Sequence, residues 1–277
     1  MPTSHGKQTD AINRDSRDYW NKRAATFTRN ATGDYERWLM ELLALEAGEE
    51  VLDMGCATGT LAIPLAKAGH RVHGCDFAEA MLAILDKRAA EQALPVSSHL
   101  LAWEDDWEAA GLGADSVDVA FASRSLMSSD VPSGVRKLDS AARSKAAVVV
   151  PASLLPSRDP RLLTYLGRAA RSPRVVRDVG RALAAMGRLP VSATTRTYRP
   201  MRFSSFDEAR SDLRRLAGPE ELTAREARLF DAYASDHVVR APHSDGDGAG
   251  AQRWTLDYRL PVTWTFIGWR TDGSAWG

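Results

Sequence analysis

The chain has 277 residues, a length that fits one α/β domain with an insertion or two small domains. Lysine plus arginine and aspartate plus glutamate balance at 36 each, so the net charge gives no sign of a nucleic-acid or membrane partner. No stretch approaches the roughly 20 apolar residues of a membrane span, and the polar start lacks a secretion signal, so we expect a cytoplasmic protein. Cys56 and Cys75 are too few for a disulfide scaffold and are not spaced to hold a metal, so both are expected to be small buried hydrophobic residues.

After a polar start, the chain is predicted to enter a series of alternating strands and helices. Residues 1–14 lack hydrophobic periodicity and are predicted to be disordered, and residues 15–48 form an N-terminal helical region. The following strands are expected at 50–54, 71–75, 96–101, 116–122 and 145–150, and the helices between them at 58–68, 79–92 and 133–143. This alternation predicts a parallel sheet over residues 49–151, with helices on both of its faces.

The next segment, residues 152–190, is divided by prolines. Its two helices are predicted at 161–171 and 173–186. Residues 191–199 are predicted to form a sixth strand, and residues 254–269 are rich in β-formers and predict the last one. Pro261 interrupts this last run, which suits an edge position or a bulge.

Within residues 191–277 we expect a helical insertion at 204–237. Ser205 and Thr223 are each followed three residues later by glutamate, the sequence pattern of a capping box at a helix start. Residues 244–250 are predicted to be a flexible loop. We expect the helices at 158–187 and 204–237 to form a cap.

The most informative stretch is the loop that follows the first predicted strand, VLDMGCATG. Gly55 and Gly59 allow the backbone to bend sharply and to approach a ligand closely. The spacing D-x-G-x-x-x-G departs from the dinucleotide pattern G-x-G-x-x-G, and Thr60 stands where a phosphate-binding P-loop needs lysine. Asp53 would repel a pyrophosphate but suits the ammonium group of an amino-acid moiety.

Acidic residues also follow the next strands. Asp76 ends the second strand, where a carboxylate can accept hydrogen bonds from ribose hydroxyls. The third strand leads into WEDDW at 103–107, whose acids could accept from an adenine amino group beside a stacked tryptophan. The fourth strand ends in FASRS at 121–125.

Taken in order, these segments resemble the class I S-adenosylmethionine-dependent methyltransferase family, in particular its small-molecule members with a methyltransferase domain of type 11 or 25. The matching segments are VLDMGCATG, VHGCDFAEAML, the WEDDW loop and DSVDVAFASRSLM. The resemblance covers residues 15–150 well and the rest in outline. It implies a Rossmann-like α/β fold: a mostly parallel, seven-stranded sheet with an N-terminal helical lid and helical insertions before and after the sixth strand.

The resemblance also implies site residues, carried over by matching position. Cofactor binding by the first loop would use Asp53, Gly55, Cys56, Ala57 and Gly59. Asp76 would hold the ribose, Phe77 and Met81 would pack on the adenine, and Asp105 or Asp106 with Trp107 would contact the adenine edge. Ser123 and Arg124 would border the sulfonium and the substrate entrance. Tyr19, Trp20 and Arg23 belong to a segment that resembles the helix folded over the cofactor in many family members.

The predicted activity is methyl transfer to a small-molecule acceptor by in-line displacement, a reaction of the EC 2.1.1 type that leaves S-adenosylhomocysteine. No catalytic residue is named, because the cofactor already carries the leaving group and a base is needed only for some acceptors. His237 and His243 are expected to be surface or structurally satisfied residues. No metal is expected.

Residues 158–215 hold 14 arginines, no lysine and five acids. They form a solvated surface or recognise an anion, with RNA as the extreme case. An anionic acceptor fits the second interpretation, whereas a nucleic acid is disfavoured by the chain's balanced charge. The alternatives are therefore an RNA or protein methyltransferase that uses these arginines, or a non-catalytic protein that binds S-adenosylmethionine. We expect no membrane partner, and a monomer or homodimer.

Overall fold

The computed structural model describes residues 16–25, 27, 33–126, 130–152, 157–169, 174–199, 201–241 and 253–276. The start predicted to be disordered, the loop predicted at 244–250 and His243 lie outside these residues. No helix in the described ranges is both long and apolar enough to cross a membrane.

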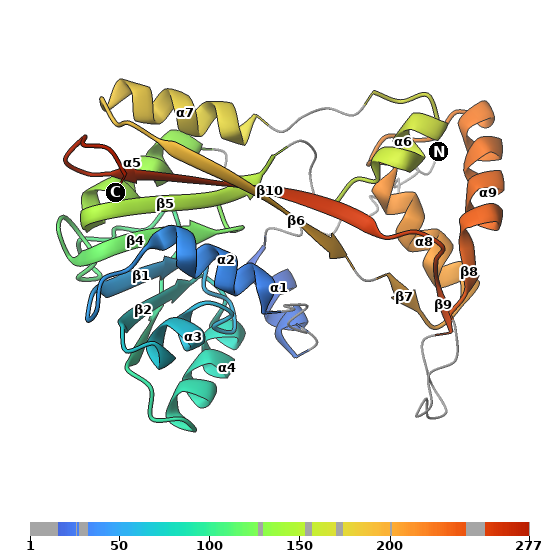
Figure 1. The fold of residues 1–277 in the computed structure, drawn as a ribbon. Coiled ribbons are helices and arrows are strands. Elements are labelled where there is room, and N and C mark those ends of the chain that lie inside the picture. Colours follow the sequence, from blue (N-terminus) through green and yellow to red (C-terminus); the bar gives the residue numbers. More distant parts are fainter. Residues whose placement is uncertain are drawn as a thin grey trace, which may run out of the picture.

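A seven-stranded sheet forms the centre of the larger part of the molecule, in the order β3-β2-β1-β4-β5-β10-β6 (Figure 1). Its strands are β1 (Glu50–Met54), β2 (Arg71–Asp76), β3 (Val96–Leu100), β4 (Val117–Ser123), β5 (Ala142–Pro151), β6 (Val191–Arg199) and β10 (Leu260–Arg270). The pairings from β3 to β5 are parallel, and β10 runs antiparallel to β5 and β6. The predicted α/β fold with a mostly parallel seven-stranded sheet is therefore confirmed.

Helices cover both faces of this sheet because its strands point alternate side chains to opposite sides. On one face, Val51 and Val119 pack with α2 (Asp34–Leu43), α3 (Ala62–Lys67) and α4 (Glu79–Ala90). On the other, Leu52 and Ala120 pack with α5 (Val131–Ala141) and α7 (Val175–Ala185). The parallel strands thus end at one edge between the two layers, which is where ligands of open α/β sheets bind.

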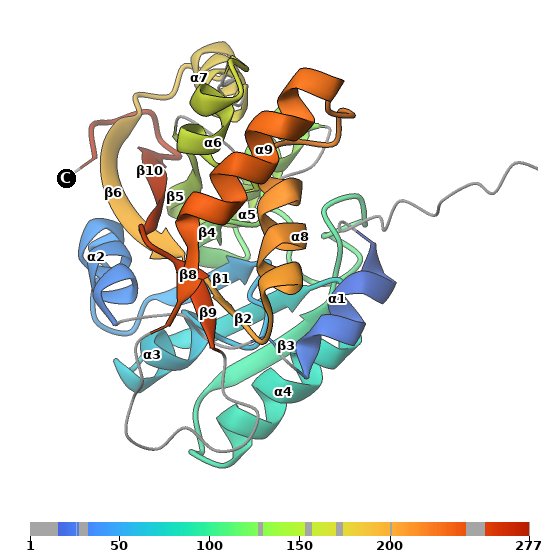
Figure 2. The ribbon, with the colours of Figure 1, turned by 90° about the vertical axis from the view of Figure 1, so that its right-hand side faces the viewer.

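A second lobe with its own apolar core stands beside the sheet, reached by the long strands β6 and β10 (Figure 1). It contains α6 (Pro160–Tyr165), β7 (Arg202–Phe203), α8 (Phe206–Leu216), α9 (Ala224–His237), β8 (Val238–Arg240) and β9 (Trp254–Leu256). The three short strands form a separate antiparallel sheet in the order β7-β9-β8, and in Figure 2 α9 lies above β8 with α8 beside it. This small sheet was not predicted from the sequence.

The single strand predicted over residues 254–269 is wrong, because this run forms β9 and β10 in two different sheets. The chain turns at Asp257, whose backbone N–H donates to the His237 carbonyl oxygen at 3.1 Å. The segment from Leu256 to Leu260 nevertheless alternates like a strand, which hid the turn. At Pro261, β10 pairs only with β6, since its pairing with β5 begins at Trp264. Proline therefore occupies a locally edge-like position, as the sequence predicted.

Two predictions about the helices also differ from the structure. The helix predicted from Thr58 begins at Ala62, because residues 56–61 first form turns around Gly59, whose N–H donates to Cys56 O. The helices expected to act together in a cap over residues 158–187 are divided between the lobes. Whereas α6 packs in the second lobe, α7 packs on the main sheet, where Arg188 after it forms a bidentate ion pair with Asp139 of α5.

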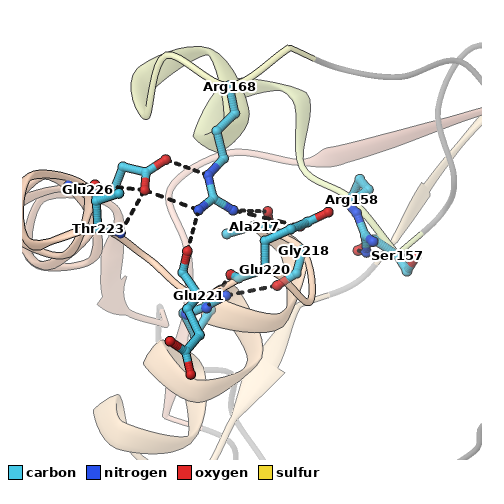
Figure 3. A network of polar contacts seen from close by, with 10 residues as sticks. Ser157, Arg158, Arg168, Ala217, Gly218, Glu220, Glu221, Thr223 and Glu226 are labelled. Carbon is cyan, nitrogen blue, oxygen red and sulfur yellow. Dashed lines mark hydrogen bonds and ion pairs between the residues drawn. The ribbon is translucent and has the colours of Figure 1, made fainter.

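Arg168 connects the end of α6 to the start of α9 in the second lobe (Figure 3). Its guanidinium donates to both carboxylate oxygens of Glu226, at 2.6 and 3.2 Å, and to the backbone oxygens of Ala217 and Glu221. Both charged side chains are only 17% exposed. Glu226 also completes the capping box of α9 with Thr223, so one carboxylate serves two contacts. The Arg168 guanidinium is therefore engaged by groups of the same chain and has a structural role.

We expect Arg168→Met to lower the Tm of the protein by on the order of 5 °C, because it leaves the Glu226 carboxylate and two backbone oxygens without their donor. Thermal unfolding followed by circular dichroism measures this change. The matched control is Arg210→Met, which removes the more exposed ion pair with Asp231 and should have a smaller effect. Equal Tm values for the two variants would show that the Arg168 contacts do not hold the lobe together.

Candidate functional site

The loop after β1 has a left-handed backbone at three positions and packs closely against the ends of β2 and β4. Gly55, Ala57 and Gly59 all have left-handed φ angles, of 82°, 48° and 83°. The N–H groups of Gly55 and Cys56 donate to the Cys75 oxygen at 2.7 and 2.9 Å. A Cβ atom added to Gly55 would lie 2.1 Å from the Cβ atom of Ser125, in the loop after β4. The predicted glycines therefore allow two loops at the ends of adjacent strands to come into contact.

Asp53 is a buried carboxylate with one oxygen left over. Its side chain is 2% exposed, and among the described residues its Oδ2 atom has no hydrogen-bond partner. Burial, reinforced by the nearby Asp76 carboxylate, raises the pKa of Asp53 to about 7, against the opposing effect of Arg124 and the Ala62 N–H. A buried unpartnered carboxylate oxygen at the carboxyl end of β1 fits a cationic group such as the ammonium of an amino-acid moiety.

Asp76 joins the first two loops of the site. Its Oδ2 atom accepts from the Ala57 N–H and its Oδ1 atom from the Ala78 N–H, both at 2.9 Å. Burial raises the pKa of Asp76 despite these hydrogen bonds. Each carboxylate oxygen has a second lone pair, so these contacts leave acceptor capacity for the ribose hydroxyls that the resemblance implies. The contact with Ala78 also shows that Asp76 caps the turn before α4.

The N-terminal helix α1 (Arg17–Ala24) docks at the start of α4. Trp20 packs in one cluster with Ala57 of the first loop and with the buried Met81 of α4. Asn21, which was not among the predicted site residues, accepts from the Ala80 N–H at 3.0 Å and donates to Glu79 at 2.8 Å. The signal for it was the absence of a capping side chain at Ala78, before α4.

Two other predicted residues of this segment are placed by the structure. Tyr19 contacts Trp20 edge to face, with ring centroids 5.4 Å apart. Arg23 belongs to the same helix, and Phe77 follows Asp76 at partial exposure. The structure thus brings Trp20, Met81 and Ala57 together. The lid role of Tyr19, Trp20 and Arg23 and the adenine role of Phe77 and Met81 remain predictions.

The acidic residues of the WEDDW loop after β3, here called the third loop, form hydrogen bonds within that loop. Asp105 accepts from the Ala102 N–H, and Asp106 accepts from the N–H groups of Glu108 and Ala109. Trp107 is 4% exposed and donates to the Ala102 oxygen. These contacts are those of a capped turn, and the adenine role of Asp105, Asp106 and Trp107 remains a prediction.

Trp103, which was not among the predicted site residues, links the third loop to the loop after β4. Its Nε1–H donates to the Ser125 oxygen at 3.2 Å, and its ring centroid lies 5.5 Å from that of Trp107. The signal for it was the pair of tryptophans in WEDDW. Ser125 therefore contacts both the first loop and the third.

At the end of β4, Ser123 and Arg124 contact residues from distant parts of the chain. The Ser123 and Tyr35 hydroxyls are 2.6 Å apart and hydrogen-bonded. The Arg124 guanidinium lies 4.3 Å from the ring centroid of Tyr35 and 5.6 Å from that of Trp264. Tyr35 comes from α2 and Trp264 from β10, and no local pattern announced either as a site residue.

The four histidines in the described part of the chain have structural partners. His237 lies at the end of α9 in the second lobe, with its Nδ1 atom 2.9 Å from an Asp257 oxygen. His73 contacts both His99 and Glu50, and His70 contacts the Glu49 oxygen. Cys56 and Cys75 are buried and free, as predicted.

The comparisons with known proteins agree with this architecture. Residues 51–145 match the family model of a methyltransferase domain. An uncharacterised protein of Haemophilus influenzae is 30% identical over 130 residues, which cover 46% of this chain and 47% of that protein. The chain spans less than half the length of the curated relatives it matches.

Solved structures share the fold at low sequence identity. A provisionally assigned methyltransferase of Bacillus halodurans C-125 is 15% identical, with a TM-score of 0.53 and coverage of 86% of this chain and 99% of the other. A geranyl diphosphate methyltransferase solved in complex with S-adenosylmethionine is also 15% identical, with a TM-score of 0.50 and coverage of 96% and 93%.

The structure is an α/β fold with a mostly parallel seven-stranded sheet, and residues 51–145 within it match the methyltransferase domain model. Over residues 51–145, the chain is therefore similar to the methyltransferase family. The family uses S-adenosylmethionine as its methyl donor, which is the cofactor that the sequence predicted.

Proposed function

We propose that this protein binds S-adenosylmethionine at the carboxyl ends of β1, β2 and β4 and transfers its methyl group to a small-molecule acceptor. The observation that carries the proposal is the buried Asp53 carboxylate, whose Oδ2 atom has no partner among the described residues, beside a loop shaped by Gly55 and Gly59. An ammonium group would satisfy that oxygen. Asp76 offers the remaining acceptor positions to ribose hydroxyls.

The residues of this chain would bind, orient and exclude water. The bound cofactor supplies a methyl group on a sulfonium, which carries both the positive charge and the leaving group. Asp53 and Asp76 would hold its two ends and so fix the direction of in-line transfer. The docking of α1 through Asn21 and Trp20 would restrict water at the first loop. None of these tasks requires a general base unless the acceptor keeps its proton at neutral pH.

The contacts that arginines of residues 158–215 make within the chain favour a small acceptor over RNA. In the region 158–215, Arg168, Arg188, Arg210 and Arg214 are engaged by acids or backbone oxygens of this chain. Such arginines have fewer donors left for phosphates. A neighbour of the same fold is named for a small acceptor, geranyl diphosphate. The cytoplasmic location and the choice between monomer and homodimer remain predictions.

The test is calorimetric titration with S-adenosylmethionine and S-adenosylhomocysteine. Asp76→Asn should weaken both affinities by roughly 10- to 100-fold, because it removes charge-assisted acceptors of the ribose hydroxyls. The matched control is Asp118→Asn, at β4 in the same sheet, where the carboxylate pairs with Arg143. If the folded wild-type protein binds neither compound, the proposal is wrong. Binding without turnover across a broad panel of acceptors would favour the non-catalytic alternative.

A further inference from the structure

Arg124 is held in a conformation that an arginine seldom adopts. Its φ angle is 63°, in the left-handed region that disfavours residues with a Cβ atom. The backbone is fixed there by a hydrogen bond from the Arg124 N–H to the Val149 oxygen of β5, at 2.9 Å. Strained residues persist where the surrounding structure imposes them, and they occur often at functional sites. The left-handed backbone therefore gives the Arg124 side chain a direction that an extended continuation of β4 would not give it.

Two aromatic rings support the guanidinium. Tyr35 and Trp264 are 5% and 7% exposed, and both lie within cation–π distance of Arg124. Each ring is itself fixed by a hydrogen bond. The Tyr35 hydroxyl bonds to Ser123, and the Trp264 Nε1–H donates to the Thr197 hydroxyl at 3.0 Å. Contacts to the face of a guanidinium leave the N–H donors in its plane available.

No acid in the described part of the chain takes up those donors. Among the described residues Arg124 forms no ion pair and no side-chain hydrogen bond, whereas Arg143, Arg168 and Arg188 each form a close ion pair. Arg124 is exposed to solvent. Its chain neighbour Ser125 donates to the Met54 oxygen, next to Asp53, and abuts Gly55, so Arg124 stands at the proposed cofactor site. Its charge also opposes the rise in the pKa of Asp53. A preorganised, unpaired cation at that place is suited to an anion.

The surroundings favour a singly charged carboxylate over a doubly charged phosphate. Asp53 and Asp76 lie in the same site and would repel each additional negative charge on the ligand. A planar carboxylate can also accept two parallel hydrogen bonds from one guanidinium. The ligand chemistry that fits Arg124 is therefore a carboxylate group.

We propose that Arg124, supported by Tyr35 and Trp264, forms a carboxylate-binding subsite at the end of β4. The inference rests on the proposed function for its ligand. The carboxylate belongs either to the amino-acid end of S-adenosylmethionine or to the methyl acceptor.

The first arm of the test identifies the source with two cofactor fragments. S-adenosylhomocysteine carries the carboxylate and 5′-methylthioadenosine lacks it, and both are titrated into the wild type, Arg124→Met and Arg124→Lys by calorimetry. If the cofactor is the source, Arg124→Met weakens S-adenosylhomocysteine roughly 10-fold or more and leaves 5′-methylthioadenosine unchanged, with Arg124→Lys between. Arg181→Met, an exposed arginine of α7, is the matched control and should change neither affinity.

The second arm applies when Arg124→Met leaves both affinities unchanged. Acetate and benzoate are then titrated into protein saturated with S-adenosylhomocysteine, and the Trp264 indole N–H signal is followed by NMR after assignment with Trp264→Phe. A carboxylate-dependent shift that Arg124→Met removes supports binding of an acceptor carboxylate. If neither compound shifts the wild-type signal, or Arg124→Met keeps the shift, the subsite is overturned.

Failure of the carboxylate subsite can be distinguished from failure of the proposed cofactor binding. A wild-type protein that binds neither cofactor fragment contradicts the proposed function. The acetate titration is then run on the unliganded protein, and the same loss of signal in Arg124→Met decides for or against the subsite.

Discussion

Asp53→Asn should make the cofactor-free protein more stable and at the same time remove most of its affinity for S-adenosylmethionine. The gain should be about 2–4 kcal/mol at pH 8, because the substitution removes a buried carboxylate that must otherwise ionise with one oxygen unpartnered. The affinity should fall on the order of 100-fold, because an ammonium would then face a neutral amide. Urea unfolding and calorimetry measure the two effects on the same samples.

The pH dependence follows from the same carboxylate. Its pKa is raised in the folded protein to about 7, so the native state holds the proton more tightly than the unfolded chain does. The associated stability is present below about pH 4 and is lost as the pH rises toward 7. Asp53→Asn therefore gains most above pH 7. Cofactor affinity should fall as the pH drops below 7, by at most about tenfold per pH unit for one proton.

Asp118→Asn provides a control of opposite sign. The Arg143 guanidinium holds the pKa of Asp118 below its usual range. Its stabilising contribution is present at neutral pH and is lost as the pH falls, so the asparagine variant should be less stable at pH 8 and should bind the cofactor normally. If Asp53→Asn also lowers stability at pH 8, the carboxylate has a partner in the protein and the ammonium assignment loses its basis.

The sequence predicted those parts of the fold whose signals are local. The bounds of β1 and β6 agree with the predicted ranges 50–54 and 191–199, because each run of strand formers is bounded by glycine or proline. The division of residues 254–269 between two sheets could not be read in the same way. It depends on where Asp257 and His237 meet after folding, and the sequence around Tyr258 retains the alternation of one strand.

The same distinction holds for the candidate site. That Asp53, Gly55 and Asp76 would lie close together was predictable, because the carboxyl ends of neighbouring parallel strands meet at one edge of the sheet. The contacts that surround these residues were not predictable. The support of Arg124 by Trp264 joins positions 140 residues apart in number, and the contact of Ser125 with Gly55 requires β1 and β4 to be neighbours in the sheet. Such contacts follow from topology, which fixes them only once the chain has folded.

The contact between Gly55 and Ser125 gives the last prediction, that Gly55→Ala costs about 2–5 kcal/mol of stability. One part, roughly 1–2 kcal/mol, is the left-handed φ angle of 82° imposed on alanine. The larger part is steric, because the new Cβ atom would lie 2.1 Å from Ser125 Cβ. Gly48→Ala isolates the first part, since Gly48 has the same φ angle of 82° and no neighbouring atom within 4 Å of an added Cβ.

Removing the Ser125 side chain should restore the stability that Gly55→Ala loses through the steric clash. In the double variant Gly55→Ala with Ser125→Gly, we expect the loss to approach that of Gly48→Ala plus that of Ser125→Gly alone, and cofactor binding to recover with it. A double-mutant cycle by urea unfolding measures the coupling, expected at roughly 1–3 kcal/mol. Additive losses would mean that the loops after β1 and β4 do not touch in solution. In that case Ser125 could not link the first loop to Trp103, and the site would be more open than the structure shows.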